Sequence, residues 1–193
     1  MTRVQQPAFD QRGFTLVELI IFIVVVSAAL AGVLTVLNQS TASSADPQLR
    51  RQAQAIAESL LEEVQLMPFT FCDPDDPAVD TAASAAIIPG GCTVAEAIGP
   101  ELGETRSGAT QFDNVNDYHG FALASPPGIS DITGAPVPGL ERYSASISVQ
   151  AAALDSIPAA GDALRITVTV NGPGSTQVRL EGWRTRYAPN AAF

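Results

Sequence analysis

The chain has no lysine, one histidine and two cysteines among its 193 residues. The lack of lysine excludes any reaction that needs a lysine nucleophile. Two cysteines exclude a disulfide-dense scaffold and a four-cysteine zinc site. With His119 alone, and no GxSxG, phosphate-loop or HExxH motif, the sequence predicts neither an enzyme nor a cofactor. His119 is expected to be a hydrogen-bonding loop residue.

Charge is also scarce and unevenly distributed. Only 16% of the residues are charged, and the net charge is −10. Nucleic-acid binding needs a basic face that replaces phosphate counterions, so no nucleic-acid partner is predicted. Residues 14–45 carry a single charge, Glu18, and residues 19–37 carry none. Because a bilayer core of ~30 Å needs about 20 apolar residues in a helix, this run is long enough to span a membrane.

Three interpretations of the apolar run are open. It could be a secretory signal cleaved near residues 43–45, an uncleaved anchor, or an anchor whose polar leader, residues 1–13, is removed. A secretory leader ending there would be longer than the usual ~15–30 residues. Glu18 distinguishes the other two interpretations. A carboxylate in lipid usually has a partner, and an ordinary uncleaved anchor offers no reason for one at this position. Cleavage between Gly13 and Phe14 would place a new amine one helical turn before Glu18, on the same face.

The segment RGFTLVELII at residues 12–21 resembles the class III signal of type IV prepilins and type II secretion pseudopilins. It has a basic residue, Gly, Phe and, at the fifth position after the Gly, a Glu that leads into the apolar run. The resemblance implies that a prepilin peptidase cleaves between Gly13 and Phe14 and that the amine of Phe14 is methylated. It also implies that Glu18 pairs with the N-terminal amine of an adjacent subunit during assembly.

Arginines flank both ends of the apolar run in equal number, so the positive-inside count does not decide how the run is oriented in the membrane. Arg3 and Arg12 precede the run, and Arg50 and Arg51 follow it. The adjacency of Arg12 and the prepilin resemblance favour a cytoplasmic N-terminus and a periplasmic C-terminal domain. The expected location is the bacterial inner membrane and afterwards a pilus or pseudopilus filament.

Beyond the apolar run, the sequence predicts a helix packed on a sheet. Asp46-Pro47 predicts a kink, a short break or a new helix start. Residues 49–67 have apolar side chains at steps of three and four, which indicates an amphipathic helix, and Pro68 ends it. Three half-buried strands are indicated by alternating apolar and polar residues: 143–149, 164–170 and 176–183. The last two are expected to form a hairpin, and the apolar stripe of the helix is the expected cover of the sheet.

The predicted fold class is α+β and pilin-like. A long N-terminal helix, transmembrane in its first half and amphipathic in its second, packs on a small antiparallel sheet. The middle of the chain is rich in Pro and Gly and is expected to be irregular, with a short helix allowed at residues 93–98. The expected divisions are a prepilin leader (1–13), a transmembrane and assembly helix (14–45), an amphipathic helix (46–67), a Pro/Gly-rich variable loop region (68–142) and the antiparallel sheet with the C-terminal tail (143–193).

Cys72 and Cys92 lie 20 residues apart in the loop region. They could form a redox pair or bind a metal, but an oxidising periplasm favours a disulfide that pins the loop. By resemblance, major pilins usually carry their disulfide near the C-terminus, so a pair just after the helix indicates a minor subunit.

Two groups of oxygen-bearing side chains in the loop region could bind Ca²⁺. Neither has the Gly and closing Glu of an EF-hand loop, and such turns are common without metal. The sequence therefore offers calcium candidates, above all Asp113, Asn116 and Asp117, without predicting a metal site. The two groups are Asp73, Asp75 and Asp76, and Asp113, Asn114, Asn116 and Asp117.

The predicted function is that of a minor pilin or pseudopilin subunit. FDNVNDYHGF, together with LLEEVQLMPFTFCDPDD, resembles the MshD-type minor pilins of mannose-sensitive haemagglutinin (MSHA) pilus biogenesis. The implied partners are the prepilin peptidase, other pilin or pseudopilin subunits and an inner-membrane assembly platform. Two alternatives stay open: a membrane-anchored periplasmic binding protein that does not polymerise, and a DNA-receptor pilin that uses a local patch such as Arg184 and Arg186.

Overall fold

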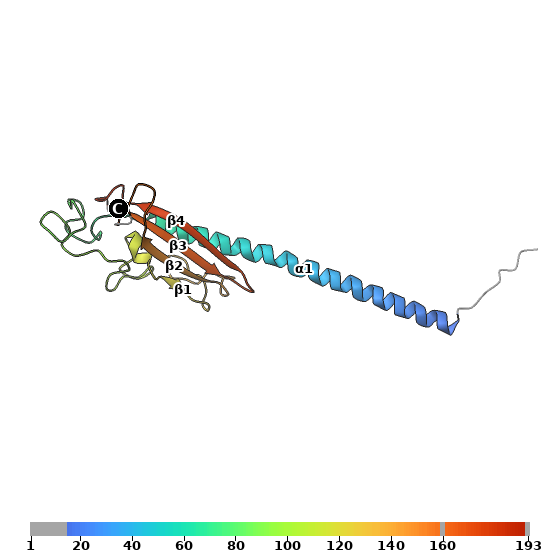
Figure 1. Cartoon of the computed structure of the whole chain (residues 1–193). Coiled ribbons are helices and arrows are strands. Elements are labelled where there is room, and N and C mark those ends of the chain that lie inside the picture. Colours follow the sequence, from blue (N-terminus) through green and yellow to red (C-terminus); the bar gives the residue numbers. More distant parts are fainter. Residues whose placement is uncertain (1–14, 159–160, 192–193) are drawn as a thin grey trace, which may run out of the picture. The chain divides into compact units, whose positions relative to one another are not determined.

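The computed structural model describes residues 15–158 and 161–191, apart from the side chains of residues 39–46. The chain divides into two compact units, residues 1–45 and 46–193. Helix α1 (Leu16–Leu66) contributes to both of them (Figure 1). The two units are described separately below.

The described part of the first unit is the apolar part of α1. Residues Leu16–Asn38 are long and apolar enough to cross a membrane. Fourteen large apolar side chains between Leu16 and Leu37 are 53–74% exposed. A helix with apolar side chains on all sides needs an apolar environment such as lipid or other helices.

The part of α1 in the second unit is amphipathic. Its buried face confirms the predicted apolar stripe and consists of Ala53, Ile56, Ala57, Leu60 and Val64. Leu49 and Met67 pack against the same core and are partly buried. Because α1 contains Pro47, the short break and the new helix start that the sequence allows there are wrong. The helix ends at Leu66, two residues before Pro68, whose ring disfavours helical geometry in the preceding residue.

Four antiparallel strands form the sheet in the order β1-β2-β3-β4 (Figure 1). Their bounds are β1 Ala122–Leu123, β2 Ser144–Ala151, β3 Ala163–Asn171 and β4 Gln177–Thr185. The three predicted strands and the β3–β4 hairpin are confirmed, whereas the two-residue β1 is too short to give a periodic signal. Val149 pairs with Ile166, which pairs with Gly182, so alternate residues of each strand lie on the same face. The α+β class predicted from the sequence is confirmed.

Gly182 allows α1 to approach the sheet closely. A Cβ at this position would lie 2.5 Å from Nε2 of Gln65 and 2.9 Å from Cδ1 of Leu61, both on α1. A larger residue in β4 would force these two side chains to move. Close packing against α1 therefore explains a glycine in the interior of β4, where glycine otherwise weakens a strand.

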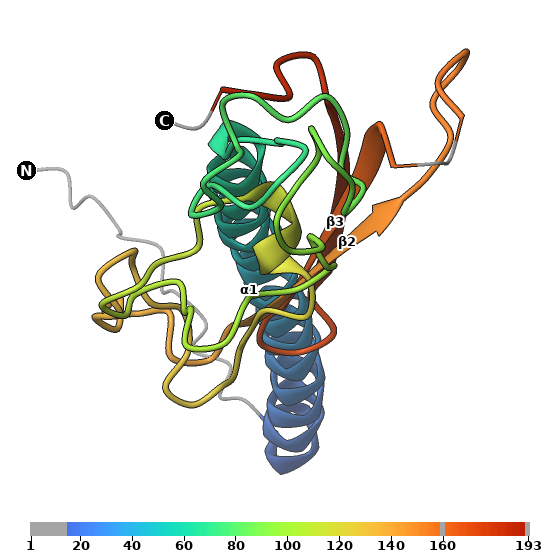
Figure 2. The same ribbon diagram turned by 90° about the vertical axis from the view of Figure 1, so that its left-hand side faces the viewer.

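The middle region, residues 68–142, is irregular but well packed. Apart from β1 and the 3-10 helix η1 (Val115–Tyr118), it consists of turns and extended segments. Figure 2 shows much of this region beside the part of α1 that belongs to the second unit. Five of its side chains belong to the main core together with α1 and the sheet: Phe69, Phe112, Val115, Tyr118 and Ile129. This region thus completes the core in addition to forming surface.

No helix forms at residues 93–98, all of which the structure describes, so that expectation is wrong. The N–H groups of Thr93 and Val94 donate to Oδ2 of Asp76 at 2.9 and 3.1 Å. The carbonyl of Ala97 accepts from Nδ2 of Asn116. Side chains from elsewhere in the chain therefore hold this backbone, and local periodicity gives no sign of such contacts.

Candidate functional site

Glu18 lies in the first turn of α1, where the helix dipole favours a negative charge. Thr15 caps this end of the helix. Its Oγ1 accepts from the N–H of Glu18 at 3.3 Å, and its carbonyl accepts from the N–H of Leu19 at 3.1 Å. The Thr-x-x-Glu spacing is that of a capping box. Local helix chemistry therefore favours Glu18 at this position, in addition to any role in assembly.

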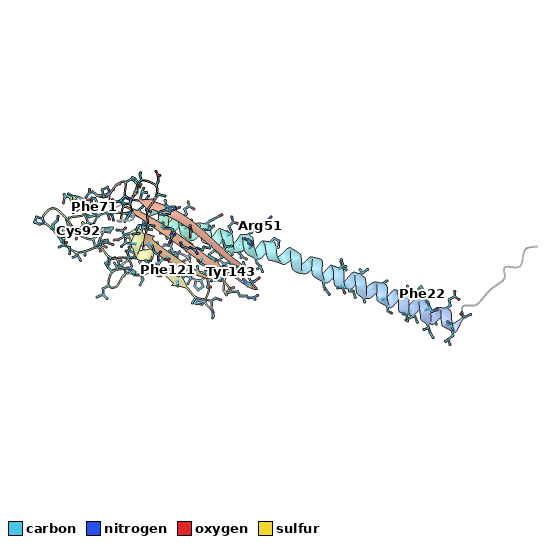
Figure 3. All side chains as sticks on the ribbon, viewed as in Figure 1. Phe22, Arg51, Phe71, Cys92, Phe121 and Tyr143 are labelled. Carbon is cyan, nitrogen blue, oxygen red and sulfur yellow. A yellow bond between two sulfur atoms is a disulfide. The ribbon has the colours of Figure 1, made fainter. Side chains whose placement is uncertain are left out.

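The surroundings of Glu18 are apolar and open. Phe22, one turn further along, stands out from the helix with no packed layer around it (Figure 3). Within the described residues, no basic side chain forms an ion pair with Glu18. Gly13 and Phe14, the expected processing residues, lie outside the described residues.

The second set of candidate residues surrounds η1. Asn114 caps this helix, since its Oδ1 accepts from the N–H of Val115 at 2.8 Å. The Oδ2 atom of Asp117 accepts from the N–H groups of Asn114 and Asp113 at 2.7 and 3.1 Å. The side chain of Asp117 is completely buried. Nδ2 of Asn116 donates to Oε1 of Glu96 and to the carbonyl of Ala97, so η1 contacts the 96–97 segment.

The structure brings the two acidic groups of the sequence together. Carboxylate oxygens lie within 4.8 Å of one another in three sets: Asp73, Asp75 and Asp113; Asp73, Glu96 and Glu101; and Glu101, Glu104 and Asp117. Asp73 and Glu101 are each shared by two sets, so the sets are continuous. We call these seven carboxylates the acidic cluster. Sequence reasoning did not single out Glu96, Glu101 and Glu104, because they are spread along an irregular segment.

Several oxygens of the acidic cluster are buried without a hydrogen-bond partner. These atoms are Oδ2 of Asp73, Oε2 of Glu96, Oε2 of Glu101, Oδ1 of Asp113 and Oδ1 of Asp117. Oδ1 of the adjacent Asn116 is in the same state. The ion pairs found within the described residues involve none of the seven carboxylates. Buried polar atoms are normally hydrogen-bonded, so this concentration of unpaired oxygens requires a physical explanation.

Burial and mutual repulsion shift the titration of these groups. Burial, and secondarily the charge of Asp73, raises the pKa of Asp113 to about 7. Burial raises the pKa of Asp117 to about 7 against the opposing effect of its two backbone hydrogen bonds. Burial and the neighbouring carboxyl of Glu104 raise the pKa of Glu101 to about 8. The pKa values of Asp73 and Glu96 are raised as well, mainly by burial.

Asp76 differs from its neighbours because its hydrogen bonds satisfy it. Oδ2 accepts from Oγ1 of Thr93 at 2.6 Å and from two backbone N–H groups, while Oδ1 accepts from the N–H of Ala78 at 2.8 Å. The hydroxyl of Thr93 and these N–H groups lower the pKa of Asp76 to about 2. Asp76 is therefore a structural anion and not a calcium candidate.

Cys72 and Cys92 form a disulfide with a Cα–Cα distance of 5.4 Å. Both are buried, in a small cluster with Val79 and Ala82 against which Phe71 packs (Figure 3). In the chain-entropy model, closing a loop of this length stabilises a fold by about 3 kcal/mol. The disulfide and the hydrogen bond between Asp76 and Thr93 join the same two segments, residues 72–76 and residues 92–93.

An ion pair between buried Arg106 and partly buried Glu63, which the sequence did not reveal, joins α1 to the middle region. The Nε and Nη2 atoms of Arg106 donate to the two carboxylate oxygens of Glu63 at 2.7 and 2.8 Å. The hydroxyl of Tyr118 donates to Oε1 of Glu63 at 2.8 Å. The carboxylate of Glu63 raises the pKa of Arg106. The signal in the sequence was slight: an isolated arginine in a region rich in acidic residues.

His119 has a structural contact, as the sequence analysis expects of a loop histidine. Its Nδ1 accepts from the N–H of Val149, in β2, at 3.2 Å. Since His119 directly follows η1 and Val149 lies in β2, this hydrogen bond connects the end of η1 to the sheet.

Comparison with known proteins gives a match at the N-terminal end of the chain. Residues 9–34 match the family model of the prokaryotic N-terminal methylation motif. The N-terminus carries a prepilin-type methylation motif. No curated protein and no solved structure matches the chain.

The methylation motif supports a type IV prepilin-like protein. It spans Gly13, Phe14 and Glu18 and continues into the apolar part of α1, so the motif and the membrane-spanning candidate overlap. Such a motif implies processing by prepilin peptidase and assembly with other pilins. It is typical of structural subunits rather than enzymes, and with the apolar helix it fits a single-pass inner-membrane anchor.

Proposed function

We propose that the protein is a minor pilin or pseudopilin. In this proposal, prepilin peptidase removes residues 1–13 and the amine of Phe14 is methylated. Residues 14–45 then hold the chain in the inner membrane, with the N-terminus in the cytoplasm and the second unit in the periplasm. An inner-membrane assembly platform transfers the subunit from lipid into a filament.

The observation that carries the proposal is the overlap of the methylation motif with an exposed apolar helix. The motif covers residues 9–34, and the apolar part of α1 covers Leu16–Asn38. A helix with this surface can be buried either by lipid or by the helices of neighbouring subunits. The same residues therefore anchor the chain in the membrane before assembly and pack against neighbouring subunits after it.

Glu18 gives the assembled filament its register. A carboxylate in an apolar layer is costly unless a cation neutralises it, and the methylated amine of Phe14 in an adjacent subunit is the proposed cation. The pair forms only when the two helices are level. Axial slippage therefore leaves both charges unpaired.

The finer assignment is to a minor subunit of an MSHA-like pilus, of the MshD type. Two features support it: the disulfide lies directly after α1 rather than near the C-terminus, and residues 112–121 have the sequence FDNVNDYHGF. The proposed role is structural, with no enzymatic activity and no nucleic-acid partner.

The test of this function is incorporation into filaments sheared from cells. We expect Glu18→Gln and Glu18→Ala to be cleaved normally but to be reduced severalfold or more in the sheared fraction. The contact from Thr15 survives both changes, because Thr15 accepts from the backbone N–H of Glu18, and glutamine also keeps a capping-box residue at this position. Loss of incorporation in Glu18→Gln would thus report the missing charge rather than a damaged helix.

Thr35→Val is the matched control in the same apolar segment. The hydroxyl of Thr35 donates to the carbonyl of Ala31, in the same helix, at 2.8 Å. Its removal leaves the charge of Glu18 in place, so incorporation should be normal. Normal incorporation of both Glu18 variants would refute the assembly role of Glu18. Absence of the unmodified protein from every filament fraction would refute the subunit function.

The alternative is a membrane-anchored periplasmic binding protein that does not polymerise. An open groove of about 610 Å³ between α1 and residues 129–140 favours it. Ile56 and Ser59 line the groove on one side, and Ile132 and Pro138 line it on the other. This alternative predicts that the protein stays in the membrane fraction and that Glu18 variants have no effect on its distribution.

A further inference from the structure

The acidic cluster lies where three segments of the middle region meet. Asp73 and Asp75 follow α1, Asp113 and Asp117 flank or belong to η1, and the glutamates come from residues 96–104. Each segment contributes carboxylates, but within the described residues no ion pair neutralises them. Repulsion would drive these segments apart unless something offsets it.

Asp117 is the most informative member of the cluster. Its side chain has no exposed surface, and Oδ1 has no hydrogen-bond partner. Its other oxygen, Oδ2, is fixed by two backbone N–H groups, so the orientation of the carboxylate is set. One oxygen of this carboxylate lies within 4.8 Å of carboxylate oxygens of Glu101 and Glu104. A buried and oriented acceptor that faces two other carboxylates has the properties of a metal ligand.

The spacing of the oxygens fits one class of ion. Ca²⁺ binds six to eight oxygens at ~2.3–2.6 Å, so two ligands of one ion are at most ~5 Å apart. The oxygens within each set of the cluster meet this limit. Zn²⁺ prefers His and Cys ligands, and neither occurs in the three sets. Mg²⁺ requires a compact octahedron and retains several waters, which an irregular set of protein carboxylates fits less well.

We propose that the acidic cluster binds Ca²⁺. Asp117, Glu101 and Glu104 form the inner part of the site, and Asp73, Glu96 and Asp113 extend it toward the segment after α1. The ion neutralises carboxylates that otherwise repel one another and ties residues 73–75, 96–104 and 113–117 together. This site does not depend on the processing of the N-terminus, so its test is independent of the filament proposal.

The experiment uses the full chain purified in detergent and freed of metal with EDTA. At neutral pH, calorimetric titration with CaCl₂ should show saturable binding of at least one ion, with a dissociation constant of roughly 10⁻⁶–10⁻³ M. Ca²⁺ should raise the midpoint of thermal unfolding, because it binds the folded chain alone. MgCl₂ at the same concentration should give a smaller shift.

Two variants and one control assign the binding to these residues. Asp117→Asn removes the buried charge, and its amide oxygen can still accept from the backbone. Asp73→Asn changes a half-buried member whose Oδ1 accepts from the N–H of Asp75 at 2.6 Å, a contact that asparagine can keep. Each should weaken Ca²⁺ binding by about 10-fold or more. Asp80→Asn removes an exposed carboxylate outside the three sets and should leave binding unchanged.

Three results would overturn the proposal. The first is the absence of calorimetric binding and of any thermal shift in the unmodified chain, which would mean that protonation neutralises the cluster. The second is an equal loss of binding in Asp80→Asn, which would indicate diffuse attraction to an acidic surface. The third is unchanged binding in both Asp73→Asn and Asp117→Asn while each variant unfolds cooperatively.

Discussion

At the residue scale, neighbouring carboxylates of the middle region have opposite environments. Asp76 accepts hydrogen bonds with both oxygens, and its pKa is lowered. Asp73, three positions earlier, has a buried oxygen without a hydrogen-bond partner, and its pKa is raised. The sequence DPDD could not distinguish them, because three of the hydrogen bonds to Asp76 come from Thr93 and Val94, which are distant in the sequence. The sequence did identify both acidic groups, but it gave no sign that the structure unites them through Asp73 and Asp113.

The raised pKa values predict an unusual pH dependence in the absence of divalent cations. A folded chain whose carboxyl pKa is raised binds more protons than the unfolded chain, in which the pKa is about 4. Stability therefore falls as pH rises through that interval. Asp113 and Asp117, with pKa values of about 7, and Glu101, at about 8, place the interval between about pH 4 and pH 8.

In EDTA, the midpoint of thermal unfolding should consequently be higher near about pH 5 than near about pH 8. Asp117→Asn should reduce this difference, because it removes one of the titrating groups, and Asp80→Asn should preserve it. A midpoint in EDTA that rises steadily over the same range would contradict the environment described for these carboxylates.

At the element scale, periodic segments were predictable and polar packing was not. The stripe on α1 and the alternation in β2, β3 and β4 come from side-chain spacing, which the sequence displays directly. The η1 helix and the 93–98 segment contact distant partners: Thr70, which accepts from Asn114 at the cap of η1, for the first, and Asp76 and Asn116 for the second. Such partners become neighbours only after folding, so the sequence could not show that the short helix allowed at residues 93–98 does not form.

The Glu63–Arg106 pair is the main polar connection between α1 and the middle region. Arg106 is 6% exposed and also donates to the carbonyls of Ser130 and Asp131. Removing one partner of a buried pair leaves the other without compensation. We therefore expect Arg106→Gln to lower the free energy of unfolding by roughly 2–3 kcal/mol in chemical denaturation.

Glu63→Gln should have a similar effect, because it also frees the hydroxyl of Tyr118 from its charged acceptor. Glu62→Gln is the matched control, since Glu62 is the adjacent residue on α1 and is exposed. Loss of stability in the Glu62 variant equal to that in the Glu63 variant would show that general charge on the helix, and not the buried pair, is responsible.

At the scale of the whole molecule, the low charge content is the average of two different units. The described part of the first unit is an apolar helix with exposed side chains, whereas the second has its own core, sheet and disulfide. The sequence predicted this contrast because a membrane-spanning run and a periodic globular segment have distinct patterns. It could not predict how residues 68–142 complete the core, because their burial follows no repeat.

The central claim is that this chain is processed as a prepilin, and the mature N-terminus tests it most directly. The measurement is the intact mass of the protein extracted from membranes of its native host. The account predicts the mass of residues 14–193 with the disulfide intact and one added methyl group. A chain that still begins at Met1, or one that begins at Asp46 as a secretory signal would leave it, would contradict the account.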